Sequence, residues 1–193
     1  MMTVSPDQDR VESQLAAGEL SCPSCDGGKL GPWGWARPRQ VGRGTRRRQV
    51  RPRRSRCRGC RATHVLLSVG MLLRRSDWVE VIGRALELKA AGVGQRPIAA
   101  KIGVPRSTVR GWLARFAEMA ERLRAHFTRW ALWEDVRLSR IEPAGSLLAD
   151  AVAALVVAAS ATGAGCVWRF AAAATAGRLL CNTSSPFPAP FNR

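Results

Sequence analysis

The sequence of 193 residues predicts a mainly α fold with a small β element near its N-terminal end. Three observations lead to this prediction. Two Cys-x-x-Cys motifs bracket an arginine-rich stretch, apolar residues recur at helical spacing in the middle of the chain, and a long alanine-rich stretch follows. The length suits one medium domain or two small ones.

The first 19 residues are polar, and they contain no apolar run typical of a signal peptide. We therefore expect a disordered N-terminus over residues 1–19. Without an export signal the chain is expected in the cytoplasm, where thiols stay reduced, and no membrane association is expected.

Two cysteine pairs form the most specific motif of the chain. Cys22 and Cys25 make the first Cys-x-x-Cys, and Cys57 and Cys60 make the second. Each tight turn can supply two thiolates, and four thiolates complete the tetrahedral coordination of one structural Zn²⁺. Two disulfides are disfavoured in a reducing compartment, and a redox pair is disfavoured because two such motifs flank one basic segment. We therefore predict a zinc ribbon over residues 20–70.

The chain between the cysteine pairs has the residue types of a long β-hairpin. Trp33 and Trp35 alternate with small residues, as on one face of a strand. Residues 40–49 are rich in glycine and arginine and are expected to form a flexible tip. After the second pair, a further run of strand-forming residues completes a three-stranded ribbon. The expected strands span residues 30–39, 50–56 and 62–67.

Arginine is concentrated in the same segment. The chain has a formal net charge of +17, and residues 31–76 hold fourteen arginines and no acidic residue. This distribution indicates a polyanionic partner, and the arginine fork fits phosphate and guanine edges better than an ammonium group does. A compositional bias could explain arginine in place of lysine, but not the missing counter-charges. The arginines expected to contact DNA here are Arg43, Arg46, Arg47 and Arg48 at the tip, and Arg51, Arg53 and Arg54 on the return strand.

The middle of the chain predicts three helices. Asp77 and Glu80 form an Asp-x-x-Glu variant of the capping box, so a first helix is expected to begin here and to end at Gly92. A short second helix begins near Pro97, whose fixed φ suits the first turn of a helix, and it stops at Gly103. A third helix begins near residue 105 and is expected to continue to about residue 141.

The segment QRPIAAKIGVPRSTVRGWL, residues 95–113, has the pattern of a helix-turn-helix. Ile98, Val109 and Trp112 occupy positions that hold two helices at a wide angle, and a glycine lies in the turn between them. An ordinary α-hairpin is the alternative. We predict a tri-helical helix-turn-helix domain over residues 76–141, with a long third helix.

In a helix-turn-helix, the third helix enters the major groove of DNA with its N-terminal end. Arg106 or Arg110 could bind guanine O6 and N7 with two hydrogen bonds. Ser107 and Thr108 could bind phosphate or cap the helix, and Arg115 lies further along and could reach a phosphate. These five residues are the predicted DNA contacts of the helix.

The alanine-rich residues 144–181 are expected to form a helical hairpin. Hydropathy alone could suggest a membrane span, but Asp150 and several polar residues dilute the stretch. The hairpin is expected to pack on the long helix or to form a homodimer interface. Cys166 and Cys181 are expected to be buried small hydrophobic residues. Residues 182–193 contain three prolines and are expected to form a disordered tail.

The paired Cys-x-x-Cys motifs, followed by IAAKIGVPRSTVRGWL, resemble a group of small zinc-ribbon/helix-turn-helix proteins of high-GC bacteria, whose domains have no assigned function. The same layout is similar to the DNA-binding N-terminal part of insertion-sequence transposases. The resemblance covers roughly residues 20–140 and implies recognition of an element end or an operator. The catalytic half of such transposases needs three separated carboxylates on an α/β domain, whereas only Glu142 and Asp150 are acidic after Ile141.

These observations predict a zinc-dependent protein that binds double-stranded DNA and is not an enzyme. We expect a transposase-associated accessory protein or a transcriptional regulator, located in the cytoplasm with the nucleoid. A transposase encoded nearby and a second copy of the chain are the further expected partners. An RNA-binding zinc-ribbon protein is one alternative, because ribbons and arginine-rich arms also bind RNA. The DNA-binding remnant of a full transposase is the other.

Overall fold

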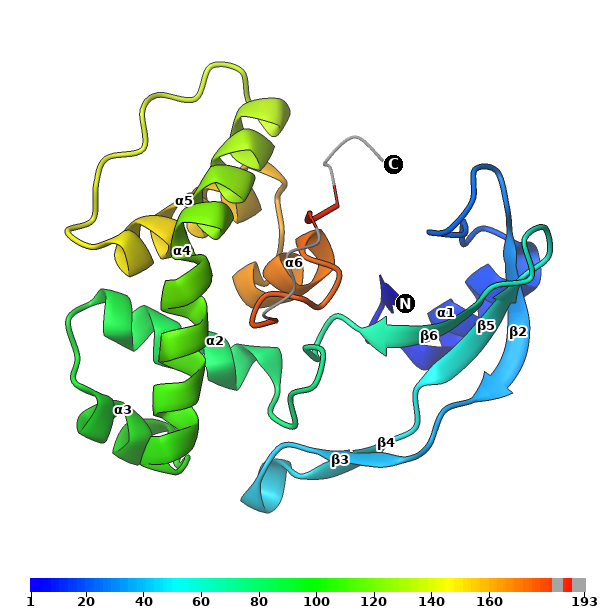
Figure 1. Ribbon diagram of the computed structural model, residues 1–193, viewed down its shortest axis with the longest axis horizontal. Helices are drawn as coiled ribbons and strands as arrows, with labels where there is room; N and C mark the ends of the chain where they lie inside the picture. Colours follow the sequence, from blue (N-terminus) through cyan, green and yellow to red (C-terminus); the bar gives the residue numbers. More distant parts are fainter. Residues whose placement is uncertain (182–185, 189–193) are drawn as a thin grey trace.

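The computed structural model describes residues 1–181 and 186–188, which fold into a β-rich N-terminal part and a helical C-terminal part (Figure 1). A two-stranded hairpin extends from the β-rich part along the lower edge of the molecule toward the helices. The predicted fold class, mainly α with a small sheet, is confirmed.

The strands are β1 (Met2–Val4), β2 (Leu30–Trp35), β3 (Arg39–Val41), β4 (Arg48–Val50), β5 (Arg53–Cys57) and β6 (Thr63–Ser68). The helices are α1 (Gln8–Ala17), the short 3₁₀ helix η1 (Gly44–Arg46), α2 (Val79–Ala90), α3 (Gln95–Ile102), α4 (Arg106–Glu134), α5 (Leu147–Ala161) and α6 (Val167–Ala174).

A four-stranded sheet in the order β1-β6-β5-β2 forms the centre of the N-terminal part. β1 runs parallel to β6, and the other neighbouring strands are antiparallel. α1 packs on this sheet, and its Val11 and Leu15 are buried in a cluster with Leu30 and Leu66. This apolar cluster is small, so the N-terminal part needs a further source of stability.

The prediction that residues 1–19 are disordered was wrong. They form β1 and α1, and Asp7 caps α1 by accepting hydrogen bonds from two backbone N–H groups of its first turn. Gly18 ends the helix in the left-handed conformation at φ 67°. The polar composition concealed an i, i+4 apolar pair, Val11 and Leu15, and this pair is sufficient to anchor the helix on the sheet.

The expected long hairpin is divided into two paired segments. β2 pairs with β5 next to the cysteines, and β3 pairs with β4 beyond them. Pro38 and Pro52 lie in the gaps between the two segments, where a residue without a backbone N–H can be accommodated. The residues expected to form a flexible tip, 40–49, are therefore largely held in β3, η1 and β4.

Trp33 and Trp35 do not share one face of β2, contrary to the prediction from their alternation. A register shift at Trp33 interrupts the pairing with β5. Trp33 stacks on Arg56 and Trp35 stacks on Arg53, with the guanidinium carbons 4.5 Å and 4.8 Å from the ring centroids. Because Arg53 and Arg56 are three residues apart on β5 and point to opposite faces, the two rings also lie on opposite faces.

The helical part has one continuous apolar core between α2, α3 and α4. Ile98, Val104, Val109 and Trp112 are buried in it, at the positions expected from the helix-turn-helix pattern. α5 lies along the C-terminal half of α4, and α6 packs on α2 (Figure 1). The core therefore holds the α3–α4 turn in place at one end of the molecule.

The expected capping box at the start of the first helix does not form. α2 begins at Val79, with Trp78 at the N-cap position and no side-chain cap hydrogen bond. The Asp77 carboxylate instead forms an ion pair with Arg43 of the hairpin, and the Glu80 carboxylate pairs with Arg169 of α6. Ion pairs with residues distant in the sequence therefore form in place of the helix-capping contacts that the spacing suggested.

The long helix α4 ends at Glu134, earlier than the expected end near Ile141. The Asp135 side chain accepts a hydrogen bond from the backbone N–H of Arg137 over 2.9 Å, which forms a local turn that competes with helix continuation. Val136, just beyond the end of the helix, is 86% exposed.

α5 and α6 occupy the alanine-rich segment 144–181. Cys166 and Cys181 are only partly buried, rather than fully buried as expected. In the part of the chain that the structure describes, no helix is both long enough and apolar enough to cross a membrane. Most of the tail expected to be disordered, 182–193, lies outside the described residues, and within it Phe187 packs against the helical core.

Two glycines inside helices differ in what surrounds them, and they provide a matched test of this packing. An alanine Cβ at Gly83 of α2 would collide with the Trp168 ring of α6, whereas one at Gly111 of α4 would meet no atom within 4 Å. We expect Gly83→Ala to lower the free energy of unfolding by about 1–3 kcal/mol through overpacking. Gly111→Ala should raise it by up to about 1 kcal/mol through helix propensity. Urea unfolding followed by circular dichroism measures both, and equal stability of the two variants would contradict the packing of α6 on α2.

Candidate metal centre and nucleic-acid interface

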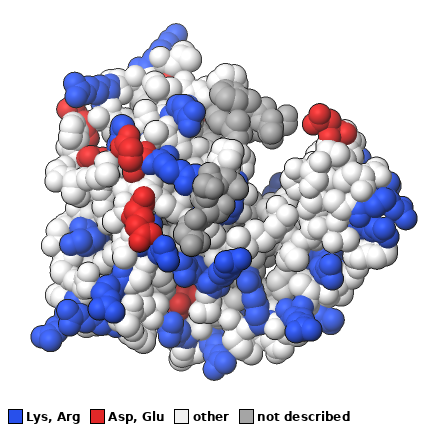
Figure 2. Space-filling model, in the orientation of Figure 1, with Lys and Arg blue, Asp and Glu red and all other residues white. Residues whose placement is uncertain are grey.

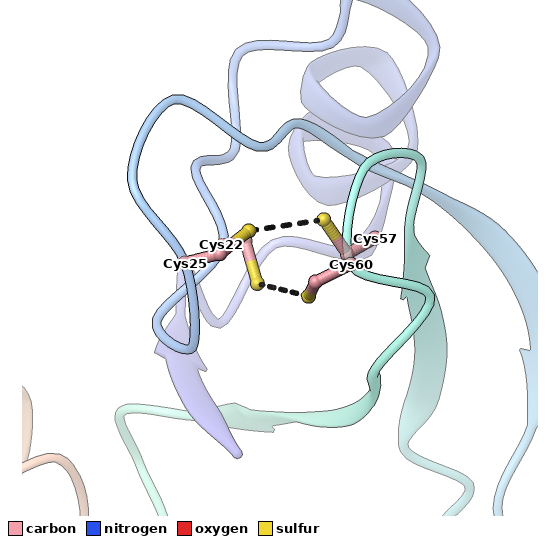
Figure 3. Close-up of side chains that lie close together, drawn as sticks. All are labelled: Cys22, Cys25, Cys57 and Cys60. Carbon is pink, nitrogen blue, oxygen red and sulfur yellow. Dashed lines mark hydrogen bonds between the residues drawn. The ribbon is translucent and has the colours of Figure 1, made fainter.

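The four predicted metal ligands converge at one end of the sheet (Figure 3). The Cys22 and Cys60 sulfurs are 3.8 Å apart, and the Cys25 and Cys57 sulfurs are 3.6 Å apart. All four sulfur atoms lie within 4.8 Å of one another. Cys57 ends β5, and Cys22 and Cys25 lie in the loop that leads into β2, so the pairing of β2 with β5 brings the two motifs together.

The sulfur distances identify what this cluster can hold. A disulfide would place two sulfurs about 2.05 Å apart. Four thiolates around Zn²⁺ at about 2.3 Å define a tetrahedron whose edges are roughly 3.8 Å. The closest sulfur pairs, at 3.6 Å and 3.8 Å, match the tetrahedron and not the disulfide. The cluster can therefore hold a metal ion such as zinc, and all four donors would be used in doing so.

The surroundings shift the pKa values of two of the cysteine thiols in opposite directions. Burial raises the pKa of the Cys57 thiol, but the backbone N–H groups of Cys60 and Gly59 act against it, and the pKa is lowered to about 7. Hydrogen bonds with the Cys60 and Cys57 sulfurs raise the pKa of the Cys25 thiol to about 12, because these bonds favour its protonated form. A bound divalent cation would favour the ionised form of all four groups.

His64 lies beside the cluster. It is buried on β6, and its Nε2 atom is 3.5 Å from the Cys22 sulfur. The backbone N–H of Ser24 lies 3.3 Å from the same sulfur and donates to it. These contacts orient Cys22 from outside the ligand set, as is common around structural metal sites.

Gly28 is a determinant of the site that the sequence analysis did not single out. A Cβ atom at this position would lie 2.5 Å from the Cys25 sulfur and 2.7 Å from the Cys57 sulfur. The Gly28 carbonyl also accepts a hydrogen bond of 2.7 Å from the backbone N–H of Cys22. The sulfur atoms occupy the space that a side chain would need at position 28, which explains the glycine there.

The α3–α4 turn builds the second candidate site. Gly103 adopts the left-handed conformation at φ 67°, and the backbone N–H of Val104 donates to the carbonyl of Ala99. α4 then begins with Pro105 at its N-cap and no side-chain hydrogen bond to the first turn. The Thr108 N–H donates to the Pro105 carbonyl, so the N–H groups of Arg106 and Ser107 are the ones available to an anion.

The first turns of α4 present most of the predicted contact residues to solvent. Arg106, Ser107 and Arg110 are exposed, and Thr108 is partly buried. Arg115 is partly buried and forms an ion pair of 2.8 Å with Glu118 within the helix. The predicted DNA contacts of Arg106, Ser107, Thr108 and Arg110 are thus geometrically possible, whereas Arg115 would first have to leave its partner.

The hairpin arginines divide into two groups. Arg46, Arg47 and Arg48 are exposed at or beside the tip. Arg43 is held by Asp77, and Arg53 is held by Glu12 and by the backbone carbonyl of Gly34. The exposed Arg51 donates to the backbone carbonyl of Ala36, and Arg54 is partly buried on β5. Of the predicted set, the three tip arginines are therefore the ones best placed to bind a ligand.

Basic side chains gather along the lower edge of the molecule, from the α3–α4 end across the hairpin to the sheet (Figure 2). Arg96 and Lys101 are exposed on α3 and were not among the predicted contacts. Lys101 lies two residues before the turn glycine, Gly103, which was visible in the sequence. It also lines a cleft together with hairpin residues, which was not visible there.

Comparison with protein families matches residues 79–126 to the Homeodomain-like domain. The match covers 48 of the 193 residues and includes α2, α3 and most of α4. Comparison with curated proteins and with solved structures gave no match. The predicted helix-turn-helix is confirmed, and a domain of this kind suggests DNA binding.

The metal centre can be tested with three variants. Cys57→Ser should abolish stoichiometric zinc because it removes one of the four donors. Gly28→Ala should lower zinc affinity because its Cβ displaces two sulfurs, whereas Gly59→Ala, with its Cβ 3.8 Å from the Cys57 sulfur, should keep the metal. Zinc content by mass spectrometry and zinc transfer to a chromophoric chelator measure these effects. One zinc per chain in Cys57→Ser, or equal retention in Gly28→Ala and Gly59→Ala, would contradict the four-thiolate site.

Proposed function

We propose that this protein binds double-stranded DNA through two adjacent elements, with a structural zinc ion holding the N-terminal ribbon together. The N-terminal turns of α4 enter the major groove, and the arginine hairpin contacts the neighbouring backbone or minor groove. One observation carries the proposal. The exposed N-terminal turns of a homeodomain-like helix and the exposed arginines of the hairpin tip lie on the same basic edge of the molecule (Figure 2).

The two elements have different roles in this proposal. Arg106 and Arg110 supply base recognition, because a guanidinium can bind guanine O6 and N7 together. Ser107 and the free N–H groups at the start of α4 bind phosphate and set the orientation of the helix. The three tip arginines contribute affinity through counterion release, which does not depend on sequence.

Zinc acts in this proposal through structure alone. The metal site lies at one end of the β2–β5 ladder, and the arginine hairpin extends from the other end. Structural zinc contributes on the order of 10–16 kcal/mol in small zinc peptides, far more than the small apolar cluster here can supply. Removal of the metal should therefore loosen the β2–β5 ladder from which the hairpin extends.

We further propose a binding protein without catalytic activity, either a transposase-associated accessory protein or a transcriptional regulator in the cytoplasm. The resemblance of its two motifs to transposase N-terminal parts supports this assignment and a transposase as a partner. Self-association as a homodimer is supported by exposed apolar side chains at the far end of α4 and on α5. These side chains are Leu132, Val136, Leu147 and Val156.

Base recognition by α4 is tested with Arg110→Ala. We expect weaker binding to a site selected from a random DNA pool, by about 1–3 kcal/mol, and little change on unrelated DNA. Arg124→Ala is the control, because Arg124 lies about four turns further along the same helix and pairs with Glu121. An equal decrease on selected and unrelated DNA would rule out base reading by Arg110. Stronger competition by structured RNA than by duplex DNA would instead favour an RNA-binding protein.

The contribution of the hairpin is tested with the triple variant Arg46→Ala, Arg47→Ala, Arg48→Ala. The slope of log affinity against log salt should decrease on any DNA sequence, by about 0.9 for each phosphate that the variant no longer binds. Titrations at several salt concentrations, on selected and unrelated duplexes, provide the measurement. An unchanged slope would remove the hairpin from the interface.

A further inference from the structure

A cleft of about 500 Å³ separates the hairpin tip from the helix-turn-helix. One wall is the hairpin segment 42–46, the floor is the start of α2, and the other wall is the α3–α4 turn, 101–104. The cleft therefore joins the two elements that the proposed function assigns to DNA. The charged residues that line it are Arg43, Arg46, Asp77, Glu80, Arg84 and Lys101.

Most of these charges are already neutralised by partners. Asp77 pairs with Arg43, and Glu80 pairs with Arg169 of α6. Arg84 pairs with Glu87 one turn further along α2. Arg46 and Lys101 remain, on opposite walls, and both are exposed. Neither has an acidic partner among residues 1–181 and 186–188, so the cleft presents two free cations to an anion that lies between them.

The hairpin wall is fixed by contacts that meet at Asp77 and Trp78. Both carboxylate oxygens of Asp77, which is 4% exposed, accept hydrogen bonds from the Arg43 guanidinium over 2.7 Å and 3.2 Å. The Trp78 Nε1–H donates to the backbone carbonyl of Arg46 over 3.0 Å. The backbone N–H of Gly42 donates to the carbonyl of Ser76 over 2.7 Å.

Glycine is required at position 42 for this attachment. Its φ is +85°, and a Cβ atom there would collide with the Arg46 carbonyl and the Trp78 indole nitrogen. The preceding residue, Val41, is fully buried in a cluster with Leu67 and Met71. The hairpin is therefore held in place on both sides of its turn, and its tip cannot behave as a free arm.

We propose that this cleft receives the phosphodiester backbone of one DNA strand, bound between Arg46 and Lys101, and that Asp77 is a positioning residue that holds the two walls at the required separation. The inference rests on the proposed function and specifies its second contact. The backbone of a DNA strand fits this cleft because it is a linear polyanion. Its phosphates can contact one cation on each wall, and the cleft does not have to enclose it. The cleft also leads directly to the first turn of α4, where the N–H groups of Arg106 and Ser107 are free to bind the next phosphate.

The phosphate contact is tested first with Lys101→Gln, an exposed substitution that should not affect folding. The salt slope of duplex binding should fall by about 0.9, equally on selected and unrelated sequences, because one phosphate is no longer bound. Arg46→Gln should give the same decrease. Lys29→Gln is the matched control, because Lys29 is also exposed but lies in the cysteine loop and bonds to Ser21. An unchanged slope in Lys101→Gln and Arg46→Gln would overturn the proposal.

The role of Asp77 is tested with Asp77→Asn, for which two explanations predict opposite changes in DNA affinity. By charge alone, removing an acid near DNA should strengthen binding. If Asp77 positions the hairpin, binding should weaken and the salt slope should fall despite the more positive charge. Glu121→Gln, which removes an exposed acid paired within α4, should not weaken binding. Stronger binding by Asp77→Asn would overturn the positioning role.

Two further comparisons test the positioning role of Asp77 and separate a failure of the cleft inference from a failure of the proposed function. In the background of the triple arginine variant, Asp77→Asn should have no additional effect on the slope, because there is no basic hairpin tip left to position. An additional decrease in that background would contradict the positioning role. If wild-type protein fails to bind duplex DNA at all, the proposed function itself fails. If Arg110→Ala loses specific affinity while the cleft variants behave as wild type, only the cleft inference fails.

Discussion

The convergence of four sulfur atoms is the constraint on which the arrangement of this molecule depends. The N-terminal part has a small apolar cluster, built mainly from α1 and the facing strands, and such a cluster alone gives marginal stability. The cysteine motifs join the loop before β2 to the end of β5, so a bound metal would cross-link the ladder at its base. The β2–β5 ladder therefore sets the direction in which the arginine hairpin extends.

The hairpin then meets the helical part at Asp77 and Trp78. Here Asp77, the first acidic residue after a long basic segment, is almost fully buried and holds Arg43. The Asp77 carboxylate is buried while the Arg43 side chain is 42% exposed, so losing Arg43 would leave a buried charge without a partner, which is costly. The cysteine-bearing ribbon and the helix-turn-helix are therefore mechanically connected, so that a displacement of one can move the other.

Several features followed from the sequence because they depend on local rules. The Cys-x-x-Cys pairs predicted the four-cysteine cluster through spacing alone, and the segment 95–113 predicted the helix-turn-helix through its apolar periodicity and its turn glycine. Local rules also gave two wrong predictions. Asp77 and Glu80 have the spacing of a capping box, but each found an ion-pair partner far away in the sequence. Trp33 and Trp35 alternate as if on one face, but a bulge rotated one of them away.

The sequence by itself determined the four-cysteine cluster, the helix-turn-helix and the excess of positive charge, because each follows from the type and spacing of neighbouring residues. Only the tertiary structure decided which arginines are free. Arg43 and Arg46 look equivalent in the sequence, yet one is neutralised by a carboxylate 34 positions away and the other remains exposed. The physical reason is that an ionic partner is chosen by distance in space, and folding brings together residues that no sequence window contains.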